Sequence, residues 1–287
     1  MSGPRGSRPQ GSRIAARFAA LKHAGRGALI PFLEAYDPDR ETSMAILRGM
    51  PAAGADLIEI GMPFTDPMAD GPIIQAAARR GLLAGVTVAR ILEMVGDFRA
   101  GDDTTPVVLM GYLNPLLSYG LEPFCADAAR AGVDGLIVVD LPPEEADMLV
   151  PHARTHGIDF IRLVAPTTGD ARLPQVMRGS SGFVYYVSIT GITGTRGATP
   201  EHLAAAIPRI RAATDLPIAI GFGVRTPAQA AEASRVADAA VVASALIETL
   251  SRHLDEDGKP LAGAAEAVLA QVRELAAAVR GKGDSHS

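Results

Sequence analysis

Short apolar segments alternate with longer amphipathic segments along most of the chain. The short segments are rich in β-branched residues and are apolar at successive positions, which is typical of strands covered on both faces. We therefore predict eight strands, at Ala28–Leu33, Leu57–Gly61, Pro106–Tyr112, Gly135–Asp140, Asp159–Val164, Gly182–Ser188, Pro217–Gly221 and Ala239–Ser244.

In the longer segments apolar residues recur at helical spacing, and several boundaries carry helix signals. Thr226 and Gln229 form a capping-box pattern around Pro227, and Thr199-Pro200 starts another segment in a similar way. We predict helices at Glu41–Ala53, Val88–Phe98, Leu121–Ala131, Glu144–His156, Asp170–Arg178, Pro200–Ala212, Pro227–Val236 and Leu261–Val279.

The strict alternation of strand and helix predicts one domain built around a parallel sheet. Eight repeats favour closure of that sheet over an open doubly wound sheet, and a length of 287 residues suits such a barrel. The predicted fold class is α/β, a single (β/α)8 TIM barrel with parallel strands and extra short helices. We place the barrel domain at residues 14–280, between a disordered leader at residues 1–13 and a flexible tail at residues 281–287.

Composition and charge argue against several classes of protein. The net charge is −5 with no basic stripe, so we expect neither nucleic acid nor a membrane as partner. No apolar run suits a signal peptide or a membrane span, and we expect a cytoplasmic protein. Cys125 is the single cysteine, so no internal disulfide forms; such a residue is more often a small buried hydrophobic group than a nucleophile.

One predicted strand contains a carboxylate, Glu59, among apolar residues. Strand alternation points it away from the direction of Ile58 and Ile60. An isolated buried carboxylate costs several kcal/mol, so Glu59 is either a structural glutamate with partners or a group kept for chemistry. Loops after the strand C-termini build the sites of such barrels, which places Glu59 near the expected site.

The loop after this strand holds two more carboxylates, Asp66 and Asp70, among prolines and glycine. Loop aspartates commonly cap their own backbone, and that interpretation stays open for both. Glu59 and Asp70 could nevertheless face one pocket, one from a strand and the other from the loop that follows it.

Three later strand ends are rich in glycine and other small residues. They are Thr190–Gly197, Gly221–Gly223, and Ser244 with Ala245. Backbone N–H groups of such loops, and of a short helix that follows them, form the phosphate cradle of many barrels. A single glycine pair also serves tight turns, so only the three segments together predict a phosphorylated substrate.

The groups that two other mechanisms require are missing from the strands. The three lysines, Lys22, Lys259 and Lys282, lie off the predicted strands, so a Schiff base has no candidate amine. His152 and His156 have a metal-like spacing without a third ligand, and a solvated helix face is the simpler interpretation. With these two mechanisms set aside, the sequence favours a reaction in which carboxylates act on a phosphorylated substrate.

Several motifs together resemble the alpha subunit of tryptophan synthase, in order and at barrel spacing from about Arg17 to Val279. The run Ile58–Pro72 is the most specific of them, whereas the glycine motifs alone are weak. The matching segments are Pro31-Phe32, Asp37-Pro38, Ile58–Pro72, Leu109–Pro115, Val138–Pro142, Tyr185–Gly194 and Gly221–Val224.

The resemblance implies a (β/α) barrel lyase of L-tryptophan biosynthesis. The family cleaves indole-3-glycerol phosphate to indole and D-glyceraldehyde 3-phosphate by acid–base catalysis, without metal or Schiff base. It also implies no cofactor in this chain and a beta subunit as partner, which carries pyridoxal phosphate in an alpha2-beta2 tetramer.

The family's functional residues fall on definite positions of this sequence. Its catalytic glutamate and aspartate match Glu59 and Asp70, and Tyr185 matches the tyrosine near the glycerol chain. Asp66 and Asp140 match positions tied to communication with the partner. The substrate-binding positions are Phe32, Met110, Tyr112 and Phe222 at the indole pocket, Thr193 in a loop that could close over the site, and Gly194, Gly223, Ala243 and Ser244 beside the phosphate.

The chemistry of these residues suits that reaction. An apolar setting should raise the pKa of Glu59, which suits proton transfer at indole C3 and at the glycerol hydroxyl. Asp70, in a wetter loop, should stay ionised and hold the indole N–H as positive charge develops.

Some positions depart from the family pattern. Glu34 and Tyr36 stand where the family usually has Thr and Gly, and Ala243 stands where it usually has Gly before the serine. These departures motivate one alternative, a regulatory subunit with weak catalysis of its own. Another phosphate-binding barrel enzyme, such as an isomerase of a neighbouring pathway step, is a third hypothesis, and the spacing of Glu59 and Asp70 argues against it.

Overall fold

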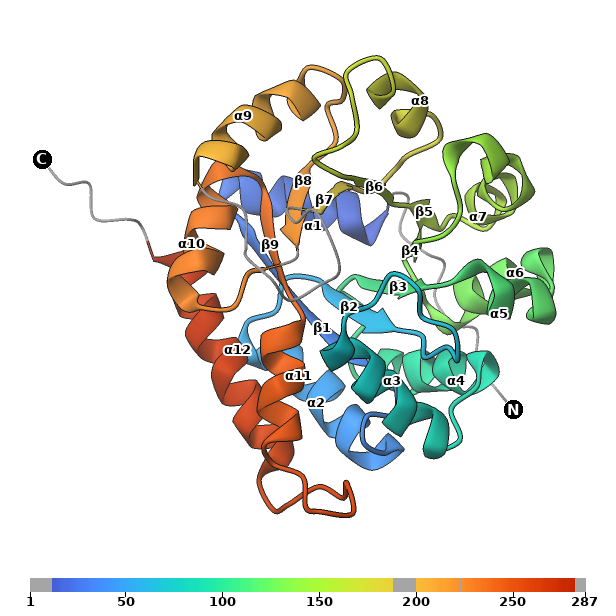
Figure 1. The fold of residues 1–287 in the computed structure, drawn as a ribbon, viewed down its shortest axis with the longest axis vertical. Helices are drawn as coiled ribbons and strands as arrows, with labels where there is room; N and C mark the ends of the chain where they lie inside the picture. The colour runs from blue at the N-terminus through green and yellow to red at the C-terminus, as the bar shows by residue number, and fades with distance from the viewer. Residues whose placement is uncertain (1–11, 188–199, 222, 282–287) are drawn as a thin grey trace, which may run out of the picture.

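The computed structural model describes residues 12–187, 200–221 and 223–281 (Figure 1). Their strands form one sheet of parallel strands in the order β5-β4-β3-β2-β1-β9-β8-β7-β6. The strands are β1 (Ala28–Glu34), β2 (Ile58–Gly61), β3 (Val107–Gly111), β4 (Gly135–Val138), β5 (Asp159–Phe160), β6 (Arg162–Val164), β7 (Val184–Val187), β8 (Ile218–Gly221) and β9 (Ala239–Val242).

The two strands at the ends of this order, β5 and β6, are halves of one predicted strand. β5 pairs with β4 and β6 pairs with β7, and only Ile161 separates the two halves. Ile161 donates its backbone N–H to the Leu136 oxygen at 2.9 Å, so the backbone continues along β4. The nine segments therefore occupy the eight positions of a barrel, which confirms the predicted (β/α)8 fold.

Helices follow the strands and cover the outside of the barrel (Figure 1). The predicted ones are α2 (Arg40–Ala53), α4 (Val88–Arg99), α6 (Leu121–Ala131), α8 (Leu173–Met177), α9 (Pro200–Arg211), α10 (Pro227–Val236) and α12 (Ala264–Arg280). Helices without a specific prediction are α1 (Arg13–His23), α3 (Pro72–Leu83), α5 (Leu113–Tyr119) and α11 (Ser244–Ser251). These four are among the extra helices that the fold class led us to expect.

The single helix predicted at Glu144–His156 is wrong, because the chain forms two shorter elements there. A 3₁₀ helix, η1 (Pro143–Met148), is followed by α7 (Val150–Thr155). Pro151 lies in the first turn of α7 and favours a new helix start there, since proline lacks an N–H donor and is best tolerated in the first turn of an α-helix.

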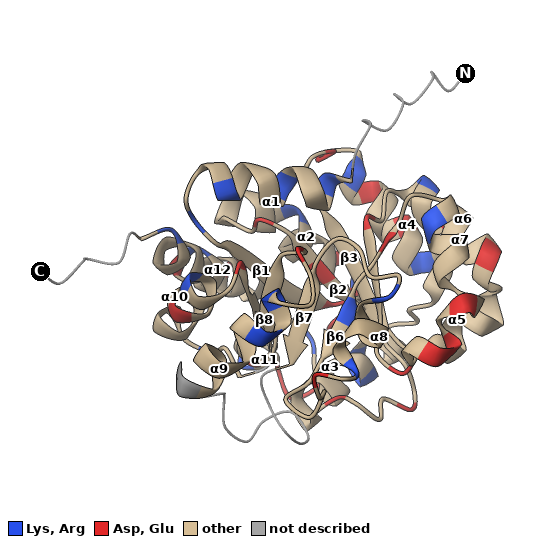
Figure 2. Cartoon of the chain, turned by 90° about the horizontal axis from the view of Figure 1, so that it is seen from above, with Lys and Arg blue, Asp and Glu red and all other residues tan. Residues whose placement is uncertain are grey.

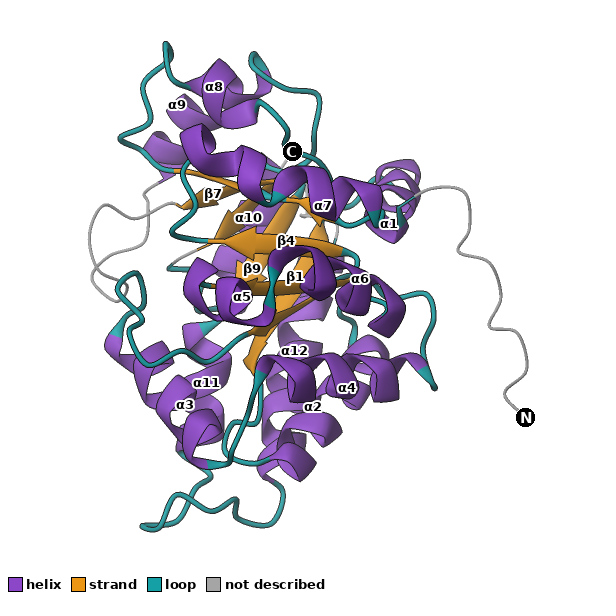
Figure 3. Ribbon diagram, turned by 90° about the vertical axis from the view of Figure 1, so that its right-hand side faces the viewer, coloured by secondary structure: helices purple, strands orange, loops and turns teal. Residues whose placement is uncertain are grey.

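The barrel interior is apolar at its N-terminal end, where α1 closes it. Ile14, Phe18 and Leu21 of this helix join the inward side chains of the strands in one buried cluster. The rings of Phe18 and Phe183 lie 5.8 Å apart. In Figure 3 the arrows of β4 and β7 point away from α1. The C-terminal ends of the strands are therefore the end left for a site.

The outer surface carries charges of both signs, interspersed over the helices (Figure 2). Within the described ranges, no helix is long and apolar enough to cross a membrane. Cys125 lies on the buried face of α6, and burial raises its pKa to about 11, so it packs as a small hydrophobic residue.

Candidate active site at the C-terminal ends of the strands

Glu59 lies in β2 and points into the barrel. Leu57, two residues before it, belongs to the interior cluster, whereas Ile58 and Ile60 pack outward under the helices. The side chain is 1% exposed, and neither carboxylate oxygen has a hydrogen-bond partner among the described residues. Burial raises the pKa of Glu59 from 4.5 to about 8, so the group is mostly protonated at neutral pH. The part of the chain that the structure describes thus offers Glu59 no side-chain partner of the kind that a structural glutamate would have.

Tyr185 lies in β7 and is the phenol that faces Glu59. It is buried, and its pKa is raised well above 10, first by burial and then by the charge of Glu59. Its ring lies across the end of β8, because a Cβ placed on Gly221 would come within 2.1 Å of the Tyr185 hydroxyl. Gly221 therefore makes room for the phenol beside Glu59.

Asp70 lies in the loop after β2, half-buried at the mouth of the barrel. Burial raises its pKa, and a hydrogen bond with the Tyr112 hydroxyl opposes that rise. The backbone N–H of Ala69 also donates to the Tyr112 oxygen at 3.0 Å. Tyr112 thus anchors the segment that carries Asp70, a role that the sequence did not suggest for it.

The other carboxylates of these loops make local contacts. The side chain of Asp66 is exposed and accepts a hydrogen bond from the neighbouring Thr65 hydroxyl at 2.5 Å, as a turn residue would. Asp140, after β4, accepts from the backbone N–H of Leu113 at 2.8 Å and so holds the first turn of α5. Among the described residues, neither carboxylate makes a hydrogen bond with Glu59.

Apolar side chains line the mouth of the barrel next to Glu59. Phe32 pairs with Glu59 in the register of β1 and β2 and packs in a cluster with Ile74 and Ile247. Met110 and Ala243 pack against the same cluster. Two of the predicted indole-wall residues, Phe32 and Met110, are therefore brought together, while Phe222 lies outside the described residues.

Two backbone features follow β8 and β9 at this same end. Gly223 has φ +87°, a left-handed conformation that favours glycine. Ser244 is the first residue of α11, after Ala243, and the first N–H groups of a helix have no partner within it. Gly194, predicted beside the phosphate, and Thr193, predicted in a closing loop, lie outside the described residues.

Glu34 is a further buried carboxyl at the mouth, and its orientation could not be read from the sequence. It lies at the C-terminal end of β1, 3% exposed, and pairs with Gly61 of β2. Its pKa is raised well above 4.5, first by burial and then by the charges of Asp70 and Asp37. Tyr36, two residues later, is buried at φ +64°, the left-handed region where a glycine is favoured.

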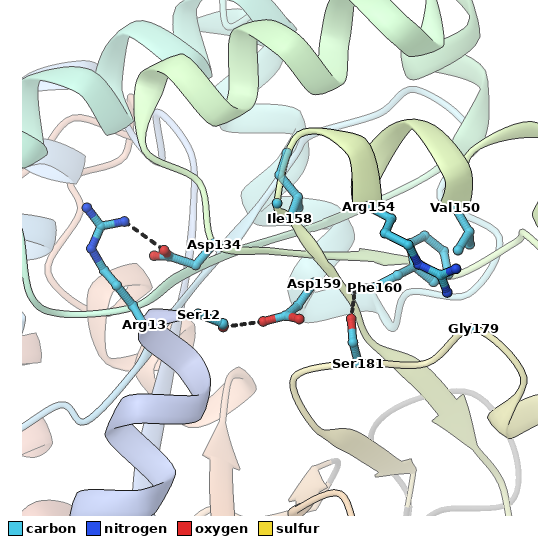
Figure 4. Close-up of a pocket in the computed structure, with 11 residues that line it drawn as sticks. Ser12, Arg13, Asp134, Val150, Arg154, Ile158, Asp159, Phe160, Gly179 and Ser181 are labelled. Atoms are coloured by element: carbon cyan, nitrogen blue, oxygen red, sulfur yellow. Dashed lines mark hydrogen bonds and ion pairs between the residues drawn. The ribbon is translucent and has the colours of Figure 1, made fainter. Parts of the chain in front are cut away.

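The barrel also has a pocket of about 380 Å³ at its opposite end (Figure 4). There Ser12 donates to Asp159 at the start of β5, and Arg13 pairs with Asp134 at 2.8 Å. These polar groups satisfy each other and fasten α1 to the strands. The pocket therefore lies where α1 packs against the strands, on the far side of the interior cluster from Glu59.

Of the two histidines with metal-like spacing, His152 lies in α7 and His156 directly follows it. Both side chains are half-buried, and His156 Nε2 lies 3.2 Å from Glu122 of α6. Within the described part of the chain, no cluster of three or more His, Cys, Asp or Glu side chains is arranged to hold a metal ion.

A closed parallel barrel with a desolvated carboxyl, a phenol and an apolar mouth at the strand C-termini is typical of (β/α)8-barrel enzymes that use acid–base chemistry. Comparison with known proteins identifies the family. Residues 18–280 match the family model described as tryptophan synthase alpha chain. The chain therefore belongs to the tryptophan synthase alpha chain family.

Individual relatives are similar over nearly the whole chain. The tryptophan synthase alpha chains of Gluconacetobacter diazotrophicus and Acidiphilium cryptum are each 70% identical, covering 94% of this chain and 98% of theirs. Among solved structures, tryptophan synthase subunit alpha from Legionella pneumophila is 36% identical with a TM-score of 0.85, covering 94% of this chain and 98% of that one.

Proposed function

We propose that this chain is a carbon–carbon lyase that cleaves indole-3-glycerol phosphate to indole and D-glyceraldehyde 3-phosphate in L-tryptophan biosynthesis. Family membership supports this reaction. The observation that carries it is Glu59, a carboxyl without a partner among the described residues, desolvated and protonated at the substrate end of the barrel.

The substrate is oriented by its two chemically different ends. The indole ring packs between Phe32 and Met110, with Tyr112 and Phe222 completing the pocket wall. The phosphate binds to backbone N–H groups near Gly194 and Gly223 and at the start of α11, where Ala243 and Ser244 lie, because a helix N-terminus favours an anion. Thr193, in the loop after β7, helps to close the site over the bound substrate.

Cleavage begins with proton transfer from Glu59 to indole C3. The electron pair of the C2–C3 double bond forms the new C–H bond, and the ring nitrogen takes up the positive charge as an iminium. The Asp70 carboxylate holds the ring N–H and stabilises this charge. A raised pKa keeps Glu59 protonated at neutral pH, so that it has a proton to give in this step, and it makes the carboxylate a stronger base for the step that follows.

The carbon–carbon bond then breaks. Glu59, now ionised, takes the proton of the glycerol hydroxyl next to C3, and the oxygen forms the aldehyde as the bonding pair returns to the ring. Indole and D-glyceraldehyde 3-phosphate are released, and Glu59 has regained its proton. Tyr185, beside Glu59, holds the glycerol chain during this step. These steps use side chains alone, with no cofactor in this chain.

Glu59→Gln is the direct test of the assignment. The amide keeps the size of the side chain but neither gives nor accepts the proton, so indole release should fall about 10²–10⁴-fold. Glu93→Gln, on the exposed face of α4, is the matched control and should match the wild type. Unchanged indole release by Glu59→Gln would show that the assignment is wrong.

The proposed partner is a tryptophan synthase beta subunit that carries pyridoxal phosphate, in a cytoplasmic alpha2-beta2 tetramer to which this chain passes indole. In this arrangement residues 14–280 form the lyase domain, between a leader at residues 1–13 and a tail at residues 281–287. Indole release should be measured with and without the beta subunit. Stimulation of the beta subunit with no cleavage in either assay would instead favour the regulatory alternative.

A further inference from the structure

Helices α3 and α11 lie side by side, and both begin at the mouth of the barrel (Figures 1 and 3). α3 starts at Pro72, two residues after Asp70, and α11 starts at Ser244, at the proposed phosphate end of the site. Near these starts the two helices share a buried cluster through Ile74 and Ile247. Both follow strands of one parallel sheet, so they run away from the mouth in the same direction.

One side chain connects the two helices at their far ends. Arg80, in the last turn of α3, donates from Nη2 at 3.1 Å to the hydroxyl oxygen of Ser251, the last residue of α11. The same guanidinium donates to both carboxylate oxygens of Asp37, after β1, from Nε at 2.6 Å and from Nη2 at 3.0 Å. Asp37 is 1% exposed, so water does not compete for this two-point contact. Arg80 therefore joins the segment after β1, α3 and α11.

α3 is attached to the barrel independently of Ser251. A Cβ placed on Gly81 would lie 2.5 Å from the backbone oxygen of Ala35, so the helix backbone packs directly on the segment after β1. The contact of Arg80 with Asp37 strengthens this attachment. In the described part of the chain, the bond from Arg80 to Ser251 is the single side-chain hydrogen bond between α3 and α11. Its loss would thus release α11 from α3 and leave α3 in place.

We propose that Arg80 is a positioning residue that sets the place of α11, and with it the phosphate end of the site, relative to the segment that carries Asp70. Asp37 fixes the guanidinium, and the guanidinium fixes the end of α11 at Ser251. α11 has eight residues and is only about 12 Å long, so a tilt at its end also moves its first N–H groups. The role rests on the proposed function, in which those groups bind a phosphate.

Ser251→Ala removes the bond to α11 and leaves the contact of Arg80 with Asp37. It should raise the Kd of glycerol 3-phosphate, a probe that has the phosphate end alone, about three- to tenfold. The Kd of indole should stay unchanged, and the loss in cleavage should lie in KM rather than in kcat. Ser118→Ala, at an exposed position of α5, is the matched control and should bind both probes like the wild type. Titration calorimetry measures both affinities.

Arg80→Lys tests the guanidinium itself. An ammonium keeps the positive charge beside Asp37 but lacks the planar fork that reaches two partners at fixed angles. This variant should weaken glycerol 3-phosphate binding by about the same factor as Ser251→Ala, and the double variant should bind no more weakly than either single variant. Arg79→Lys, at the exposed position next to it in α3, should match the wild type.

Three results would overturn the role of Arg80. They are an unchanged Kd of glycerol 3-phosphate in Ser251→Ala, an equal rise in the Kd of indole, and additive effects of the two substitutions in the double variant. A loss of folded protein is distinct from all three, because it lowers the number of binding sites for both probes rather than the affinity for one.

The same measurements separate this role from the proposed function. Indole release by a wild type whose variants show none of these shifts in Kd would refute only the role of Arg80. The expected shifts in a chain that releases no indole would refute only the proposed cleavage reaction. A wild-type chain that binds no glycerol 3-phosphate would refute the role of Arg80 as well, since α11 would then have no phosphate to receive.

Discussion

At the scale of single residues, the site depends on a glycine that makes room for a phenol. Gly221→Ala would place a methyl group 2.1 Å from the Tyr185 hydroxyl, so the ring must move away from Glu59. We expect a cost of about 1–3 kcal/mol in unfolding free energy and at least about a tenfold loss of indole release.

The control for this substitution is Gly96→Ala in α4, where an added Cβ meets no atom within 4 Å. It should stabilise the protein by about 0.5–1 kcal/mol and leave activity unchanged. Chemical denaturation and an indole assay check both variants; a fully active Gly221→Ala enzyme would show that the ring position does not matter.

The raised pKa of Glu59 has a consequence for stability. The pKa is about 8 in the folded chain against 4.5 ordinarily, so the folded state binds this proton more tightly. The stability that the protonated group contributes is present below about pH 4.5 and is lost as pH rises through about pH 8. Glu59→Gln does not titrate, so its stability relative to wild type should increase by a few kcal/mol from about pH 5 to about pH 8.

Urea unfolding of both proteins at the two pH values measures this difference. Glu93→Gln, at an exposed position, should show no comparable change. A difference for Glu59→Gln that stays constant with pH would mean that Glu59 is ionised in the folded protein.

The sequence predicts the positions of some site residues better than those of others. Strand alternation placed Glu59 on the face opposite to Ile58 and Ile60, and the packing of the strands shows that this face is the barrel interior. The close contact of Gly221 with Tyr185 joins two strands through the closed sheet, and local sequence carries no signal for it. Glu34 was visible as an unusual residue, but only the register with Gly61 shows where its carboxyl lies.

At the scale of elements, the strands and most outer helices followed from apolar periodicity, whereas α1 did not. Its helical stripe is short and follows a polar segment, and its role as the closure of the barrel depends on tertiary contacts with residues such as Phe183. The helix predicted across Pro151 was wrong for a local reason, since periodicity outweighed a breaker that should have split it.

The closure by α1 is testable with two leucine truncations. Leu21 is 3% exposed in the interior cluster, and Leu83, at the end of α3, is 78% exposed. Leu21→Ala should lower the unfolding free energy by about 2–5 kcal/mol, because it leaves a cavity at the base of the barrel. Leu83→Ala should change it by less than about 0.5 kcal/mol. Equal effects in denaturant unfolding would contradict a packed role for α1.

At the scale of the whole molecule, the barrel end that holds the site also presents exposed apolar side chains. Met68, in the loop after β2, is 80% exposed, and Leu117, in α5 after β3, is 49% exposed. Large exposed apolar side chains on the connections that follow two neighbouring strands are suited to a protein interface. Because Met68 shares its loop with Asp70, a partner bound there would act on the segment that carries this carboxylate.

We therefore expect Met68→Glu to weaken binding of the proposed beta subunit at least about tenfold, since a charge would be buried at the interface. Leu261→Glu is the matched control: Leu261 is 49% exposed but lies between α11 and α12, and its variant should bind normally. Titration calorimetry gives the affinities, and the mass of the complex tests the alpha2-beta2 stoichiometry.

Indole release by Met68→Glu without the partner should equal that of the wild-type chain alone, while its stimulation by the partner should require higher concentrations of the partner. Equal affinity of the two variants would place the partner elsewhere on the barrel.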